Sequence, residues 1–174
     1  MSIIVKKNII LIGFMGTGKS MISAYLHQIT SMPVAEMDEI IVQREGMSIP
    51  EIFSSKGDSY FRSMETGLLK ELQLQDSLII SCGGGAALRK ENVQAMKTNG
   101  IVFLLSASAE VIFDRIGSDL NRPVLNGRRS LEGISQLMQE RQPYYEAAAD
   151  YIISTDCKSA EQIAQEILHI YKNI

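Results

Sequence analysis

The sequence predicts a three-layer αβα fold, in which a parallel sheet lies between two layers of helices. Short apolar runs alternate with helical stretches along all 174 residues, the pattern of repeated βαβ units. A glycine-rich loop, Gly13–Ser20, lies between the first apolar run and the first helical stretch. Five runs are the expected strands: Asn8–Ile12, Val34–Met37, Leu78–Ser81, Ile101–Leu105 and Tyr151–Ser154.

The length and composition indicate one domain over residues 1–174. Hydrophobic residues make up 45% and charged residues 21% of the chain, with no internal repeat and no visible linker, so a sizeable core is expected. A net charge of -3 argues against nucleic acid as a partner. The apolar runs are far shorter than the roughly 18 residues of a membrane span, so we expect no membrane partner.

The amino terminus and the cysteines favour a cytoplasmic location. Lys6 and Lys7 follow the apolar residues of the amino terminus, the reverse of the order in a secretory signal. Cys82 and Cys157 form no C-x-x-C motif, which favours a reduced compartment.

The loop Gly13-Phe14-Met15-Gly16-Thr17-Gly18-Lys19-Ser20 fits the phosphate-binding pattern G-x-x-x-x-G-K-[ST]. Glycines let successive backbone N–H groups point at phosphate oxygens, and the following helix, expected over Met21–Ile29, adds its positive end. Lys19 would reach the β- and γ-phosphates, and the Ser20 hydroxyl would bind Mg²⁺. The alternative is an ordinary glycine turn beside a surface lysine.

The second strand ends in Glu36-Met37-Asp38. Ligands of open α/β sheets bind beyond the carboxyl ends of the strands. One of these acids could hold water on Mg²⁺ and the other could accept a substrate hydroxyl. Alternatively, Asp38 is only the N-cap of a helix over Glu39–Arg44; the phosphate loop nearby favours the functional interpretation.

A capping box at Ser48-Ile49-Pro50-Glu51 starts the next helix, and a longer helix is expected from Asp58 to Gln73. On it, Arg62 and Glu65 are spaced i, i+3 and share a face. The spacing alone favours a surface ion pair of under about 1 kcal/mol. The alternative is an arginine held by Glu65 so that its planar fork meets a carboxylate.

Gly83-Gly84-Gly85, directly after the third strand, would let a ligand approach the backbone closely. The alternative is a loose turn. Cys82 has no histidine near it in the sequence, so we expect a small buried residue rather than a nucleophile.

Residues 117–129, the lid segment, carry several arginines and no regular apolar period, which is typical of a lid that closes over a charged substrate. The alternative is a solvated loop. Ser130 can cap the long helix that follows, and Pro143 is expected to kink or break it. Arg141 is a candidate second anion clamp, although by itself it suggests a surface residue.

Taken in order, these motifs resemble shikimate kinase over essentially the whole chain. They are Gly13–Ser20, Asp38, Phe61-Arg62-x-x-Glu65, Gly83–Gly85, Arg122-Pro123 and Glu140-Arg141-x-Pro143-x-Tyr145. The resemblance implies a P-loop NTPase fold with a five-stranded parallel sheet in the order 2-3-1-4-5. It also implies Mg²⁺-dependent transfer of the ATP γ-phosphate to the 3-hydroxyl of shikimate, giving shikimate 3-phosphate and ADP on the way to chorismate and the aromatic amino acids.

The resemblance also implies roles for individual residues. Catalytic roles fall to Lys19, Asp38 and Arg122. ATP contacts fall to Gly16, Thr17, Gly18, Lys19, Ser20, Met21, Arg115, Arg122 and Lys158. Shikimate contacts fall to Asp38, Arg62, Glu65, Gly83, Gly84, Gly85 and Arg141, with both arginines on the carboxylate. The metal site falls to Ser20 and, through water, Glu36, where the family usually has Asp.

The expected layout is a phosphate loop at 13–20, substrate-binding helices over about 38–74 and the lid segment, in a monomer. Two other functions stay open: another carboxylate-binding small-molecule kinase of this fold, such as a gluconate kinase, or a nucleotide-binding module without catalysis. The Arg62 and Arg141 pair with Gly83–Gly85 favours shikimate.

Overall fold

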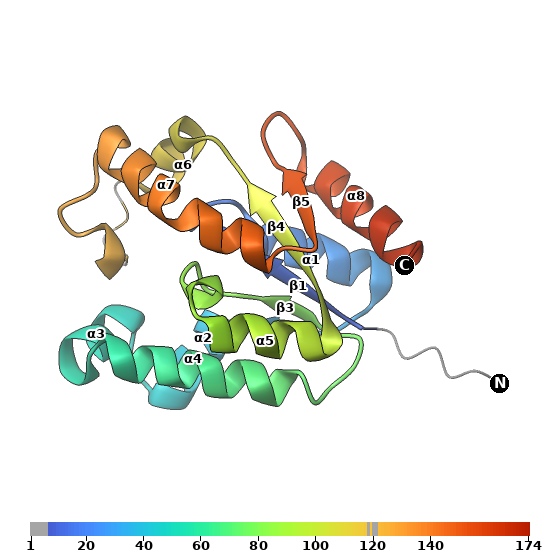
Figure 1. Ribbon diagram of the computed structural model, residues 1–174, viewed down its shortest axis with the longest axis horizontal. Helices are drawn as coiled ribbons and strands as arrows, with labels where there is room; N and C mark the ends of the chain where they lie inside the picture. Colours follow the sequence, from blue (N-terminus) through green and yellow to red (C-terminus); the bar gives the residue numbers. More distant parts are fainter. Residues whose placement is uncertain (1–6, 118, 120–121) are drawn as a thin grey trace.

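The structure is a computed structural model that describes residues 7–117, 119 and 122–174. Its centre is a five-stranded parallel sheet in the order β2-β3-β1-β4-β5 (Figure 1). The predicted fold and strand order are therefore confirmed. The strands are β1 (Asn8–Ile12), β2 (Val34–Glu36), β3 (Ile79–Ser81), β4 (Gly100–Ser106) and β5 (Tyr151–Ser154).

Helices cover both faces of the sheet. They are α1 (Lys19–Thr30), α2 (Met37–Glu45), α3 (Ile49–Lys56), α4 (Asp58–Leu72), α5 (Lys90–Asn99), α6 (Ala109–Ile116), α7 (Leu131–Ala148) and α8 (Ala160–Lys172). Short 3₁₀ turns are formed by Ala86–Leu88 and Pro123–Leu125. None of the helices in the described part of the chain is both long and apolar enough to cross a membrane.

The core has two parts, one on each face of the sheet. Alternate residues of a strand point to opposite faces, so Ile9 and Leu11 of β1 join the part beneath α1 and α8. Ile10 and Ile12 join the larger part, which the helices from α2 to α7 cover (Figure 1). Burial on both faces explains why β1 is a continuous apolar run.

Local signals place several helix ends. The predicted capping box forms at Ser48, whose N–H donates to Glu51 Oε2 at 2.7 Å. Ser130 caps α7 by accepting from the Gly133 N–H at 3.0 Å. Helix α1 begins at Lys19, two residues before the expected start, because the phosphate loop runs directly into it.

Two helices extend further than expected. Helix α2 begins at Met37, so Asp38 lies in its first turn, and the alternative that Asp38 is only an N-cap is wrong. Helix α7 runs through Pro143 to Ala148, so of the expected kink or break, the break is wrong. Proline removes only one helical hydrogen bond, while Arg141, Tyr145 and Ala148 are buried on both sides of it.

The lid segment is anchored within its described part, since Leu125 is fully buried in the larger part of the core. Residues 118, 120 and 121 of the predicted lid lie outside the described residues, as do residues 1–6, on which part of the expected location depended. Lid closure stays a prediction.

Candidate active site

The phosphate loop joins β1 to α1 in the conformation its glycines allow. Gly16 and Gly18 have φ angles of 81° and 95°, in the left-handed region that favours glycine. Lys19 Nζ curls back and donates to the Gly13 and Phe14 carbonyls at 2.8 and 3.0 Å. An ammonium group therefore lies at the mouth of the loop, where a phosphate would bind.

The electrostatics at Lys19 favour an anionic ligand. Burial lowers the pKa of its ammonium to about 8, although the nearby Asp38 carboxylate opposes this shift. A desolvated ammonium regains stability when phosphate oxygens surround it. The site is thus suited to a polyphosphate.

Ser20 and Glu36 meet beside the loop, as predicted for a metal site. Ser20 Oγ donates to Glu36 Oε2 at 3.1 Å. Burial raises the pKa of the Glu36 carboxyl, and hydrogen bonds from Ser81 and Ser20 oppose this. A hydroxyl and a carboxylate are the hard oxygen ligands that Mg²⁺ prefers. No cluster of three or more metal-ligating side chains occurs among the described residues.

Asp38 is partly buried at the start of α2, between the phosphate loop and the glycines that follow β3. Its Oδ1 has no hydrogen-bond partner among the described residues. Burial raises the pKa of this carboxyl, while Lys19, Arg122 and Arg62 hold it down. An unpartnered buried carboxylate oxygen is costly unless a ligand completes its hydrogen bonding.

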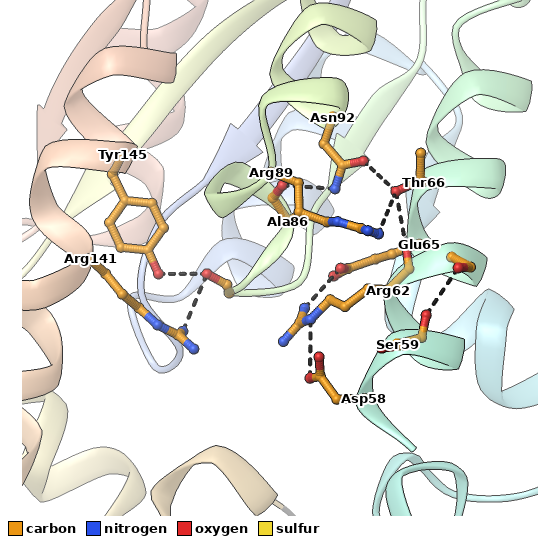
Figure 2. A network of polar contacts seen from close by, with 12 residues as sticks. Asp58, Ser59, Arg62, Glu65, Thr66, Ala86, Arg89, Asn92, Arg141 and Tyr145 are labelled. Atoms are coloured by element: carbon orange, nitrogen blue, oxygen red, sulfur yellow. Dashed lines mark hydrogen bonds and ion pairs between the residues drawn. The ribbon is translucent and has the colours of Figure 1, made fainter. Parts of the chain in front are cut away.

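Arg62 and Glu65 form a buried ion pair on α4, so the predicted surface pair is wrong. Arg62 Nη1 lies 2.8 Å from Glu65 Oε2, with side chains 14% and 0% exposed. Asp58 adds a longer contact of 3.5 Å to Arg62 Nε (Figure 2). The guanidinium also lies 5.3 Å from the Phe61 ring. Sequence spacing reports which residues share a helix face but not how deeply that face is buried.

Gly83–Gly85 is a close-approach site and not a loose turn. A Cβ on Gly83 would lie 2.8 Å from both Asp38 Oδ1 and Glu65 Oε1. A Cβ on Gly85 would overlap the Arg62 guanidinium. We call Gly83–Gly85 the triple-glycine turn; glycine is required at Gly83 and Gly85 because charged side chains occupy the space that a Cβ would need.

Arg141 approaches the same turn from α7, and it is only 6% exposed. The surface position that Arg141 suggests by itself is therefore wrong. Its Nη1 and the Tyr145 hydroxyl both donate to the Gly84 carbonyl, at 3.4 and 2.6 Å (Figure 2). Its guanidinium also lies 5.7 Å from the Phe14 ring.

The remaining predicted cations each have a partner within the chain. Arg122 Nε lies 2.8 Å from Asp119 Oδ2 within the lid segment. Arg115 donates to the Gly16 carbonyl at 2.8 Å. Lys158 pairs with Glu166 of α8 at 2.7 Å.

Two adjoining pockets bring most of these residues together. The arginine pocket is lined by Arg62, Glu65, Arg141, the triple-glycine turn and a set of apolar residues. The phosphate-loop pocket is lined by Gly16, Gly18, Lys19, Ser20, Met21 and Glu36, among others. Both pockets share Met15, Asp38, Gly83, Gly84 and Arg122. Thr17, Arg115 and Lys158 are not among the described residues that line either one.

The residues that our site prediction missed are mainly apolar. Ile49, Phe53, Phe61, Pro123 and Val124 line the arginine pocket. In the sequence, Ile49, Phe53 and Val124 cannot be told from ordinary core residues, and Phe61 and Pro123 appear only as neighbours of Arg62 and Arg122 in the motifs. Tyr145 was also missed as a site residue, although its position four residues after Arg141 puts both on one helix face.

Comparison with known proteins identifies the family. The shikimate kinase family model matches residues 15–172. A shikimate kinase of Thermodesulfovibrio yellowstonii is 39% identical, with 97% of this chain and 96% of the relative covered. One of Dehalococcoides mccartyi is 41% identical, with 97% of each covered. The chain belongs to the shikimate kinase family. The activity predicted from the motifs, a phosphotransferase of this family, is confirmed.

Solved shikimate kinases have the same architecture. The enzyme of Acinetobacter baumannii, solved in complex with shikimate, gives a TM-score of 0.91 at 33% identity and covers 96% of this chain and 93% of its own. That of Aquifex aeolicus gives 0.81 at 34% identity, with 95% and 96% covered. A gluconokinase of Sinorhizobium meliloti gives 0.61 at 16% identity, with 97% and 93% covered, which shows a shared fold alone.

Proposed function

We propose that this shikimate kinase transfers the γ-phosphoryl group of ATP to the 3-hydroxyl of shikimate, releasing shikimate 3-phosphate and ADP for the route to chorismate. The observation that carries the proposal is the meeting of the two pockets at Asp38. One pocket presents arginine forks and the other a phosphate loop. A small hydroxy acid and a nucleotide can therefore lie side by side there, with a carboxylate between them.

In the arginine pocket, Arg62 and Arg141 bind the shikimate carboxylate. Planar guanidinium groups suit carboxylates because they donate two parallel hydrogen bonds. Glu65 keeps Arg62 in place through the 2.8 Å ion pair. The triple-glycine turn lets the sugar-like ring lie against the backbone.

Asp38 hydrogen-bonds the acceptor hydroxyl and takes its proton. Burial raises the pKa of Asp38 above the ordinary value for a carboxyl, which makes it a better proton acceptor than a solvated aspartate. Its unpartnered Oδ1 is available for that hydrogen bond.

In the phosphate-loop pocket, backbone amides of the loop hold the β- and γ-phosphates, while Lys19 and Arg122 neutralise developing charge. Phosphoryl transfer depends mainly on positioning and charge stabilisation. Ser20 and Glu36 would hold Mg²⁺, Glu36 through water, and the ion would neutralise the phosphates when bound. Thr17 and Met21 adjoin the nucleotide, and Arg115 and Lys158 flank the adenine.

We further propose that residues 1–174 act as one kinase domain in a cytoplasmic monomer. Helices over about 38–74 bind the acceptor. The lid segment closes over the nucleotide, excludes water and so limits ATP hydrolysis.

The test is an ADP-release assay with shikimate, gluconate or no acceptor, combined with titration calorimetry of two variants. Only shikimate should support turnover. Arg62→Ala and Arg141→Ala should each weaken shikimate binding by about 2 kcal/mol, because each removes a buried partner of the carboxylate. Arg44→Ala is the control, since Arg44 forms an exposed pair with Glu71. Unchanged shikimate affinity in both arginine variants would refute the carboxylate assignment, and turnover of gluconate would refute the acceptor.

A further inference from the structure

Tyr145 holds the short hydrogen bond to a carbonyl that Arg141 also approaches. Its side chain is buried, and its hydroxyl donates to the Gly84 oxygen at 2.6 Å. Arg141 Nη1 reaches the same oxygen at 3.4 Å, which is long for such a bond. Figure 2 shows both side chains pointing from α7 at this one oxygen.

We propose that Tyr145 is a positioning residue: by satisfying the Gly84 carbonyl, it leaves the Arg141 guanidinium available for the carboxylate of the acceptor. This inference rests on the proposed role of Arg141. A buried carbonyl without a donor is costly. If the Tyr145 hydroxyl is removed, Arg141 Nη1 is the donor that already lies near the Gly84 carbonyl. We expect it to move toward this carbonyl and away from the pocket.

The turn that Tyr145 holds is fixed at its other end as well. Asn92 Nδ2 donates to the Ala86 carbonyl at 2.9 Å, and Thr66 Oγ1 donates to Asn92 Oδ1 at 2.7 Å (Figure 2). Helices α4 and α5 therefore hold Ala86, directly after the turn, while α7 holds the turn itself at Gly84. Arg62 lies on α4 and Arg141 on α7. The hydrogen bond from Tyr145 to Gly84 therefore links the helix of Arg141 to the same segment that the helix of Arg62 holds.

The phenol keeps its proton for the bond to Gly84. Burial raises the pKa of Tyr145, and the positive charge of Arg141 and its hydrogen bond to the phenol only partly oppose this. It therefore keeps its proton over the working pH range and does not compete for the arginine as an anion would.

The first test is Tyr145→Phe, which removes one oxygen and leaves the ring in place. We expect shikimate affinity, measured by calorimetry, to fall about tenfold, and KM for shikimate to rise by the same factor. This is the size of effect expected when a charged group loses one hydrogen bond to its ligand. KM for ATP and kcat should change less than about twofold, because the phosphate loop keeps its contacts. Tyr144→Phe is the control, since Tyr144 is 54% exposed. Calorimetric stoichiometry counts folded sites, so the affinity refers to folded protein alone.

The second test is a double-mutant cycle. In the Arg141→Ala background, Tyr145→Phe should weaken shikimate binding less than about twofold, because the group it positions is gone. An equal loss in both backgrounds would show that Tyr145 acts by another route and would overturn the inference.

The proposed role of Arg141 and the inferred role of Tyr145 would be contradicted by different results. If Arg141→Ala binds shikimate like the unmodified enzyme, the proposed role of Arg141 is wrong and the inference falls with it. If Arg141→Ala loses affinity while Tyr145→Phe keeps it, the inference alone is wrong.

Discussion

The arginine pocket and the phosphate loop hold their charged groups in different ways. In the pocket, Arg62 is ion-paired to a fully buried Glu65, and Arg141 is itself buried against the triple-glycine turn. Around the phosphate loop, Lys19 donates to carbonyls of its own loop and Arg122 to an acid of its own lid segment. We expect the first set of partners to stay in place when an anion binds, and the second set to be exchanged for the anion or shared with it.

From this contrast we infer which of the two substrate sites has its charged groups in place before the ligand binds. Contacts that are already in place reduce the cost of ordering groups when the acceptor binds. Contacts that have to be given up reduce the affinity for the nucleotide by their own free energy. We therefore expect shikimate recognition to be nearly rigid and ATP recognition to involve local rearrangement.

The largest expected effect comes from Lys19→Ala, which removes the ammonium from the phosphate loop. Turnover should fall on the order of a thousandfold, because charge stabilisation is the main contribution to phosphoryl transfer. Shikimate affinity without nucleotide should change less than about twofold, since Lys19 does not line the arginine pocket. A coupled ADP-release assay and calorimetry measure the two quantities.

The control for this variant is Lys70→Ala, whose lysine is exposed and paired with Glu91. An unchanged turnover would remove Lys19 from the catalytic set. A parallel loss of shikimate affinity would show that the two regions are not separable.

A smaller effect is expected from pH, and it tests the exchange of partners at Lys19 directly. Its ammonium has a pKa of about 8, below the ordinary 10.5, chiefly because of burial. Triphosphate oxygens favour the charged form, so binding raises this pKa. ATP affinity should therefore decline as pH rises above about 8, by up to about tenfold per pH unit.

Calorimetry in buffers of different ionisation enthalpy measures the linked proton. At pH 9 the Lys19 ammonium is about nine-tenths deprotonated without ligand, so ATP binding should take up close to one proton; at pH 7 this group should take up little. Lys19→Arg is the control, since its guanidinium stays charged at both pH values. Absence of proton uptake at pH 9 in the unmodified enzyme would contradict the prediction.

The fold could be predicted because its signals are local. The phosphate loop fixes one strand and one helix, and buried strands such as Asn8–Ile12 are short apolar runs with the same bounds in the structure. The largest shifts in the expected boundaries occur where one element runs straight into the next, as at Lys19 and at Met37, while strands such as β3 and β4 differ by one residue at one end or both. The strand order came from the family resemblance, because local patterns do not determine which strands are neighbours.

The sequence indicates which residues make up the candidate site, but not how deeply their side chains are buried. Spacing put Arg62 and Glu65 on one helix face, yet it favoured a surface pair because most such pairs are exposed. Their burial depends on packing against residues distant in sequence, among them the triple-glycine turn. Phe53 lines the pocket but carries no pattern that separates it from the core. Tyr145 is similar, because its hydrogen bond joins residues 61 positions apart.

The smallest expected effect tests the contrast most directly. Asp119→Asn removes the charge that holds Arg122 at 2.8 Å and frees the arginine for the phosphates. Because a partly exposed ion pair contributes under about 1 kcal/mol, KM for ATP should fall about threefold. KM for shikimate, whose pocket Arg122 also lines, should change less than KM for ATP. Glu140→Gln is the matched control, since it releases Arg128, which does not line either pocket. If KM for ATP rises instead, Asp119 holds Arg122 in its working position. The nucleotide side would then also be prepared in advance, and the contrast between the two regions would not hold.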